Sequence, residues 1–104
     1  MKKDDFLTEV MFRKVKSGNF KGDIEAWFPY IIADFNGNVN CYAHLGQHSA
    51  GSWDYLLFNT VPAKENEYND LKRELQSHYG YNFKIVKKRN YKRFLAELNK
   101  VRTR

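Results

Sequence analysis

The sequence has little cysteine and no long apolar run. A single cysteine cannot form an internal disulfide, which suits a reducing compartment or a fold that needs no cross-link. No hydrophobic stretch approaches the length of a membrane span. Asp4 and Asp5 follow the N-terminal lysines where a signal peptide would need an apolar stretch. We therefore expect a cytoplasmic protein with no membrane partner.

The chain also lacks internal repeats, low-complexity segments and linkers. Its 104 residues are 42% hydrophobic and 16% aromatic, which is enough for a core without cross-links. The length fits one small domain. We predict a single domain over residues 1–104, with a basic C-terminal strand and helix over residues 82–104.

Acidic residues are scarce at the C-terminal end. Residues 84–104 hold nine Lys or Arg and one acid, Glu97, whereas residues 1–83 hold nine basic and eleven acidic side chains. The whole net charge of +6 therefore comes from the last 21 residues.

The N-terminal half predicts an antiparallel sheet. Residues 9–15 suit a first strand, and residues 23–29 alternate with period two. Pro29 should end that strand or place it at an edge. Asn36 and Gly37 between two apolar runs predict a two-residue hairpin loop. That loop would pair Asp34 with Val39, Ile32 with Cys41 and Tyr30 with Ala43.

The strand after this loop is expected to continue through His48. Residues 49–52 are turn-like, and residues 53–61 then predict another strand, which Pro62 closes.

The C-terminal half predicts helices. Residues 64–79 have helical spacing, with Gly80 as the C-cap. Residues 81–89 suit a strand. Asn90 can cap a last helix whose apolar stripe is Tyr91, Phe94, Leu95, Leu98 and Val101. The fold class is α+β: an antiparallel β-meander of three to four strands, then a helix, a strand and a C-terminal helix, with the helices packed on one sheet face.

Two histidines invite a metal-site hypothesis. His44 and His48 are four residues apart, but the HExxH pattern of zinc proteases is absent. On a regular strand the two residues lie ~13 Å apart. Two ligands of one zinc ion must each lie ~2 Å from it. We therefore predict no metal and no cofactor.

The same stretch could catalyse a reaction or bind a partner. Cys41 falls in the apolar row of its strand, where a free cysteine is usually an inert hydrophobe. Asp54 could orient His44 or His48 for acid–base catalysis, or could satisfy a half-buried histidine structurally. We assign no catalytic residue. A row of aromatic and imidazole groups could bind a partner or be covered by a helix. The candidate surface is Tyr42, His44, Gln47, His48, Asp54 and Tyr55.

The basic C-terminal segment is the main binding hypothesis. Basic residues on and before a packed helix are typical of a phosphate-binding surface, although they can equally be a solvated helix face. The sequence shows no helix-turn-helix spacing, zinc knuckle or RNP1 motif. The candidate nucleic-acid-binding residues are Lys87, Lys88, Arg89, Lys92, Arg93 and Lys100.

Several short motifs occur in one order: FRK (residues 12–14), AWFP (26–29), HLGQH (44–48), DY (54–55), EYNDLKREL (67–75) and GY (80–81). In this respect the chain resembles a family of small bacterial proteins common on phages, plasmids and integrated elements. Two departures are a longer spacer before Asp54 and the basic extension after Tyr81. The resemblance implies a small cytoplasmic accessory protein of bacterial or mobile-element origin, and no chemistry.

These observations predict a non-enzymatic binding module whose partner is nucleic acid. One alternative is a phage or mobile-element regulator that binds a host protein, with Trp27 or Trp53 as an anchor. Another is a small enzyme that uses His44 or His48 with Asp54.

Overall fold

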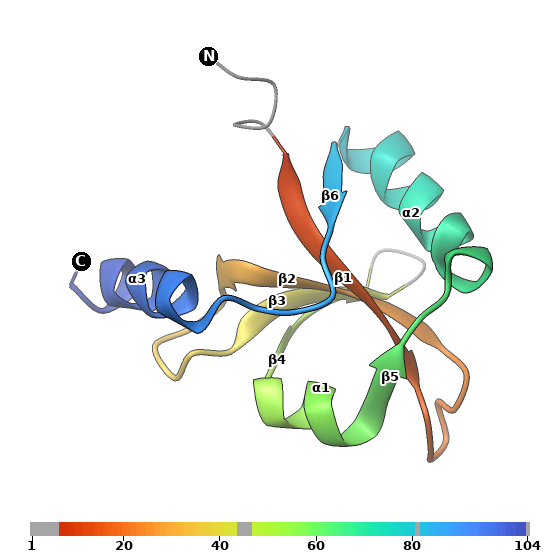
Figure 1. Cartoon of the computed structure of the whole chain (residues 1–104), viewed down its shortest axis with the longest axis horizontal. Coiled ribbons are helices and arrows are strands. Elements are labelled where there is room, and N and C mark those ends of the chain that lie inside the picture. The colour runs from red at the N-terminus through yellow and green to blue at the C-terminus, as the bar shows by residue number, and fades with distance from the viewer. Residues whose placement is uncertain (1–6, 44–46, 81, 104) are drawn as a thin grey trace.

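The computed structural model describes residues 7–43, 47–80 and 82–103. Six strands and three helices occupy these residues (Figure 1). In chain order they are β1 (Thr8–Val15), β2 (Ile24–Ile32), β3 (Val39–Ala43), β4 (Gln47–Gly51), α1 (Trp53–Asn59), β5 (Thr60–Pro62), α2 (Glu65–Tyr79), β6 (Phe83–Ile85) and α3 (Tyr91–Arg102).

The sheet has the order β4-β3-β2-β1-β5, with every neighbouring pair antiparallel. Strand β6 pairs with β1 in parallel. The predicted α+β class, with a meander followed by helix, strand and helix, is confirmed.

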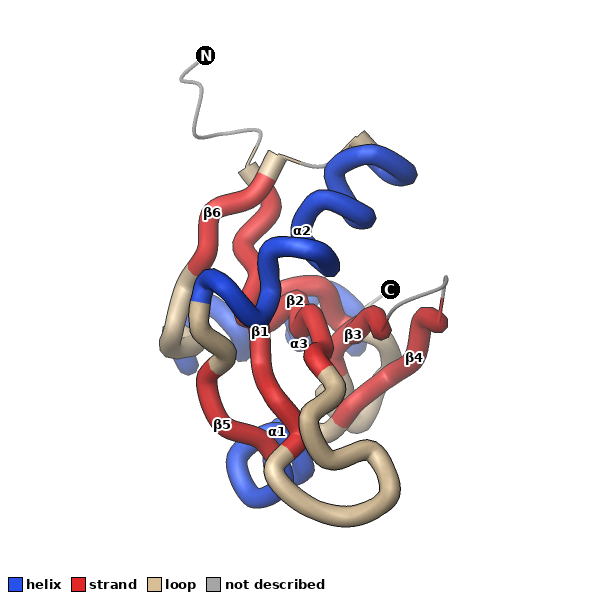
Figure 2. The backbone as a smooth tube through the Cα atoms, turned by 90° about the vertical axis from the view of Figure 1, so that its right-hand side faces the viewer, coloured by secondary structure: helices blue, strands red, loops and turns tan. Residues whose placement is uncertain are grey.

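Strand β1 shares one edge between two partners. Residues Arg13–Val15 pair with β5, and Thr8–Val10 pair with β6. The C=O of Phe12 accepts the N–H of Ala63 (3.0 Å), and the C=O of Val10 accepts that of Val86 (2.9 Å). The sheet therefore forks at the middle of β1, with β5 and β6 along the same edge (Figure 2).

Both faces of the sheet carry a hydrophobic core because successive residues of a strand point to opposite faces. One cluster is Val10, Phe12, Ala26, Phe28, Tyr42, Leu71 and Leu75. The other is Met11, Trp27, Val39, Cys41, Leu56, Phe94 and Leu98.

The C-terminal helix α3 packs on one sheet face, as expected, and α1 packs on the same face. Helix α2 packs on the other face, so the expectation that the helices share a face is wrong. The physical reason lies in the strands. Met11 and Trp27 are as buried as Phe12 and Ala26, so both faces need a cover.

The β2–β3 hairpin differs from the expected register. Ile32 pairs with Val39, and Trp27 pairs with Cys41, with an irregularity between them. The loop is wider than two residues: the N–H of Ala33 donates to the C=O of Asn38 (2.7 Å). The Asp34 carboxylate accepts the N–H groups of Asn36 (3.0 Å) and Asn38 (3.1 Å), which an Asx-type turn favours.

Pro29 neither ends β2 nor lies at an edge, so that prediction is wrong. Strand β2 is central and Pro29 is buried within it. The irregular pairing between Trp27 and Ile32 spans this position. A proline lacks the N–H that a regular ladder needs, so a strand that contains it must interrupt its pairing there.

Residues 53–59 form a helix and not the predicted strand, and residues 49–51 belong to β4 and not to a turn. The Ser52 side chain accepts the N–H of Tyr55 (3.1 Å), and Asp54 lies in the first turn. Leu56 is fully buried, whereas Leu57 and Phe58 are exposed. The apolar run over residues 53–58 is compatible with a strand, but the Ser52 N-cap stabilises a helix.

The later elements follow the prediction closely. Helix α2 ends at Gly80, whose φ of +66° makes it a left-handed C-cap. The Asn90 side chain accepts the N–H of Arg93 (3.1 Å) and caps α3. Strand β6 is shorter than the predicted strand over residues 81–89.

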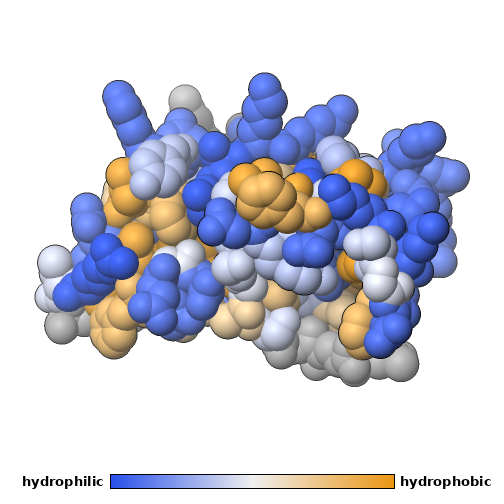
Figure 3. Space-filling model, turned by 90° about the horizontal axis from the view of Figure 1, so that it is seen from below, coloured by the Kyte–Doolittle hydropathy of each residue, from blue (hydrophilic) through white to orange (hydrophobic). Residues whose placement is uncertain are grey.

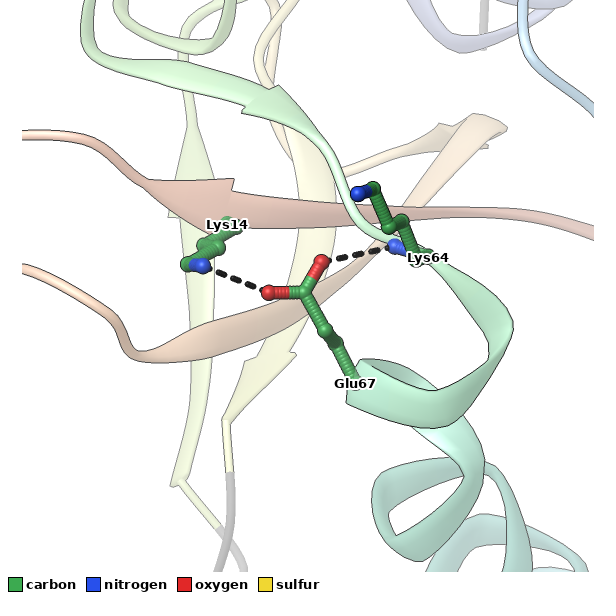
Figure 4. Close-up of polar contacts among 3 residues, drawn as sticks. All are labelled: Lys14, Lys64 and Glu67. Carbon is green, nitrogen blue, oxygen red and sulfur yellow. Dashed lines mark hydrogen bonds and ion pairs between the residues drawn. The ribbon is translucent and has the colours of Figure 1, made fainter.

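The start of α2 is fixed by one carboxylate (Figure 4). Glu67 accepts the backbone N–H of Lys64 through Oε1 (2.9 Å) and pairs with Nζ of Lys14 through Oε2 (2.5 Å). It thereby ties the helix N-terminus to β1. The hydrogen bond from Lys14 is the main cause that lowers the pKa of Glu67.

We predict that Glu67→Gln lowers stability at neutral pH and weakens its pH dependence. A carboxyl with a lowered folded-state pKa stabilises the fold above its unfolded-state pKa, and the effect is lost as the pH falls through the folded-state value. Urea unfolding at about pH 7 and about pH 3 measures both effects. Glu65→Gln, in the same turn, is the matched control. Equal losses in the two variants would contradict the role of Glu67.

We predict that Gly51→Ala destabilises the fold by about 1–3 kcal/mol, because it overpacks the core. An added Cβ would lie 2.1 Å from the Cη2 atom of the Trp27 ring, which is 1% exposed. Ala50→Val, at the exposed neighbouring position on β4, should change stability by less than about 0.5 kcal/mol. Chemical unfolding followed by tryptophan fluorescence checks this, and similar midpoints for both variants would refute the close packing.

Candidate functional site

Five of the six predicted nucleic-acid-binding residues are exposed, and three of them have no partner among the described residues. Lys87 and Lys88 lie between β6 and α3, and Lys92 lies in the first turn of α3. All three are exposed. Within the described part of the chain, none of them forms an ion pair or a side-chain hydrogen bond. Their charges are therefore available to a ligand.

Arg89 has a different environment. Its guanidinium lies 4.0 Å from the Trp53 ring centroid and 3.8 Å from that of Phe94. Its Nη1 atom is buried and has no hydrogen-bond partner among the residues that the structure describes, and burial lowers the pKa of the guanidinium. Such cation–π packing fixes the segment before α3 against α1. Arg89 therefore packs against aromatic rings, and its role in binding nucleic acid stays a prediction.

Arg93 and Lys100 are also engaged. Arg93 pairs with Glu9 (2.7 Å) and lies 4.0 Å from the Tyr30 ring centroid. Lys100 pairs with Glu97 across one helical turn (3.1 Å). The predicted set of six therefore divides into three available lysines and three partnered cations.

Aromatic side chains surround the available lysines. An open depression of about 350 Å³ is lined by Trp53, Leu57, Lys87, Lys88, Arg89 and Tyr91. Tyr91 is 61% exposed. Viewed from the side on which α1 lies, the molecule shows a central hydrophobic patch among hydrophilic side chains (Figure 3). We name the six lining residues, together with Lys92 beside Tyr91 in the chain, the basic–aromatic surface: Trp53, Leu57, Lys87, Lys88, Arg89, Tyr91 and Lys92.

Sequence reasoning missed the contribution of α1 to this surface, because it assigned residues 53–61 to a strand. The helical spacing of Trp53 and Leu57, four residues apart after a serine cap, was the signal that could have found it.

The histidine stretch does not form the expected row. Strand β3 ends at Ala43, which pairs with Gln47, so the chain reverses between them. The premise of one strand from Val39 to His48 is wrong. In the hairpin His48 pairs with Tyr42, and His44 lies outside the described residues.

Two tyrosines of the expected partner surface lie on opposite faces of the sheet. Tyr42 is 2% exposed, belongs to the cluster under α2 and donates a hydrogen bond to Glu74. Tyr55 stacks on Trp27 on the other face, with ring centroids 6.1 Å apart. The structure therefore does not bring Tyr42 and Tyr55 to one surface.

Asp54 and Cys41 have structural environments. Asp54 lies in the first turn of α1, so it does not face His48 across a second hairpin as expected. The predicted burial of Cys41 is confirmed: it is 6% exposed, and its Sγ lies 3.0 Å from Oγ of Ser49. Burial raises the pKa of the Cys41 thiol, which opposes formation of a nucleophilic thiolate.

The described residues contain no group of three or more His, Cys, Asp or Glu that could hold a metal ion. Among the helices in the described part of the chain, none has the length and apolar character needed to span a membrane.

Comparison with known proteins finds no matching family model, no matching curated protein and no matching solved structure. The family resemblance therefore stays a prediction, and the geometry alone supports a functional proposal.

We predict that Arg89→Ala destabilises the fold by about 1–2 kcal/mol, because it removes packing against Trp53 and Phe94. Lys88→Ala, at the adjacent exposed position, should be within about 0.5 kcal/mol of the wild type. Urea unfolding of both variants is the measurement. A stability of Arg89→Ala equal to that of Lys88→Ala would show that the guanidinium packing contributes nothing.

Proposed function

We propose that this protein binds single-stranded nucleic acid through the basic–aromatic surface. The observation that carries the proposal is the shared depression, in which two unpaired lysines, Lys87 and Lys88, adjoin the rings of Trp53 and Tyr91. Proteins that bind single strands combine a positively charged path for the backbone with rings on which bases stack.

The exposure and charge of each side chain indicate its role in binding the strand. Lys87, Lys88 and Lys92 would contact phosphates, because their ammonium groups have no partner within the described residues. Tyr91 would stack on a base, because its ring is the most exposed aromatic of this surface. Arg89 supports the surface by holding Trp53 in place.

Single strands suit this surface better than duplex. Exposed rings can stack only on unpaired bases, and stacking on an aromatic ring is worth about 1–3 kcal/mol per base. Helix α1 has seven residues, and three of its four exposed side chains are the aromatic or apolar Tyr55, Leu57 and Phe58, so it offers few of the polar side chains that read base edges in a major groove.

A protein partner is the second candidate function. Leu57 and Phe58 are 54% and 73% exposed, and exposed apolar groups of this kind anchor protein interfaces. Trp27 cannot be the expected anchor, because it is 1% exposed. Trp53 is half-buried and remains available at its edge.

We also infer that the protein acts in the cytoplasm. The support is the cysteine content: the single cysteine, Cys41, is free and buried, so the fold needs no disulfide and suits a reducing compartment.

We predict a salt-dependent affinity for single-stranded oligonucleotides. If three lysines each neutralise one phosphate, log K should fall with log salt with a slope of about −2. Anisotropy of labelled single-stranded DNA, single-stranded RNA and duplex DNA over a salt series measures this. The double variant Lys88→Glu/Lys92→Glu should lose most of the binding, and Tyr91→Ala should weaken it about 5- to 100-fold at unchanged slope.

The control variant is Lys16→Glu/Lys21→Glu, which makes the same charge change in the exposed loop between β1 and β2. Equal losses in the two double variants would show that only net charge matters. Absence of binding at low salt would contradict the proposal and favour the protein partner.

A further inference from the structure

The fork in the sheet contains a second cleft. It has a volume of about 690 Å³ and opens where β5 and β6 leave the edge of β1. Its apolar lining includes Phe12, Tyr68, Ile85 and Val86. The ring of Tyr68 stacks on Phe12, with centroids 4.5 Å apart and planes 11° apart. The cleft therefore offers a wall of stacked rings to a planar ligand.

The charged lining is mostly basic. Arg13, Lys64 and Lys87 line the cleft, and Glu65 supplies the acidic side chain. Within the described part of the chain, none of the three cations forms an ion pair. The local charge therefore favours an anionic ligand.

Arg13 is the informative member of this set. It is 8% exposed, and it donates to Thr60 through Nε (2.9 Å to Oγ1) and Nη2 (3.0 Å to the carbonyl oxygen). These bonds use two of its five donors and no carboxylate. Burial of a charge without a counter-charge costs free energy, which an anion in the cleft would offset.

We propose that the fork cleft binds a nucleoside monophosphate group, with the phosphate near Arg13 and Lys64 and the base near Tyr68 and Ile85. Such a group combines an anion with a planar base whose faces are apolar, as the two parts of the lining require. It can be a free mononucleotide or the terminal nucleotide of a strand. Lys87 lines both this cleft and the basic–aromatic surface, so the two sites adjoin.

The site does not depend on the proposed function, and the test separates the two. The probe is adenosine 5′-monophosphate, titrated calorimetrically into the intact chain. Adenosine, which lacks the phosphate, should bind at least ~10-fold more weakly. Lys64→Glu should also weaken binding of the monophosphate ~10-fold.

The matched control is Lys88→Glu, which makes the same charge change on the other site. It should leave affinity for the monophosphate within about twofold while it weakens oligonucleotide binding. Arg13→Gln should abolish the preference for the monophosphate over adenosine. If that variant does not fold, Ala63→Leu narrows the cleft without a change of charge and should weaken binding instead.

A 5′-phosphorylated oligothymidylate and its 5′-hydroxyl counterpart separate the two sources. A gain in affinity from the phosphate that Lys64→Glu removes identifies a strand terminus, and no gain identifies a free mononucleotide. Equal affinity for the monophosphate and adenosine, equal losses in Lys64→Glu and Lys88→Glu, or no binding of the monophosphate would overturn the proposal.

Discussion

Strand β1 pairs with three other strands, and both proposed sites depend on this arrangement. Its first edge pairs with β2, and its second edge is divided between β5 and β6. Helix α1 comes directly before β5, and the segment that leads to α3 comes directly after β6. Because β5 and β6 share one edge of β1, α1 and this segment lie on the same side of the sheet. Chain segments about 30 residues apart thereby supply the two halves of the basic–aromatic surface.

A buried arginine, Arg13, and a half-buried one, Arg89, show that a basic protein uses part of its charge for packing. Arg89 is held between aromatic rings, and Arg13 is hydrogen-bonded to Thr60 at the end of α1. Burial lowers the pKa of each guanidinium, as expected for a charge removed from water. Two of the 18 basic side chains therefore serve the packing of the fold and are less available to a ligand.

Local sequence signals predicted two helix ends correctly, the end of α2 and the start of α3. The caps at Gly80 and Asn90 were correct because each depends on a residue and its immediate neighbours. The register of the β2–β3 hairpin was wrong because the side chain of Asp34 widens the loop and Pro29 interrupts the ladder. The strand prediction for residues 53–59 was wrong because their apolar content fits a strand as well as a short helix. Only the Ser52 cap and the burial of Leu56 distinguish the helix from a strand.

The candidate site was predictable in part. The available lysines were all named from the sequence, because an excess of like charge needs no fold to be seen. Their division from Arg89 and Arg93 was not predictable, because it depends on contacts with Trp53, Glu9 and Tyr30, which lie far away in the chain. The fork cleft was invisible for the same reason, since it exists only where β5 and β6 meet one edge of β1.

The most direct test of the account is a map of amide and indole NMR shifts during titration with a single-stranded oligothymidylate. The account predicts that the changes concentrate at Trp53 and Leu57 and at residues 87–92, and that they diminish with added salt. Changes confined to β3 and β4, or no changes at low salt, would contradict it.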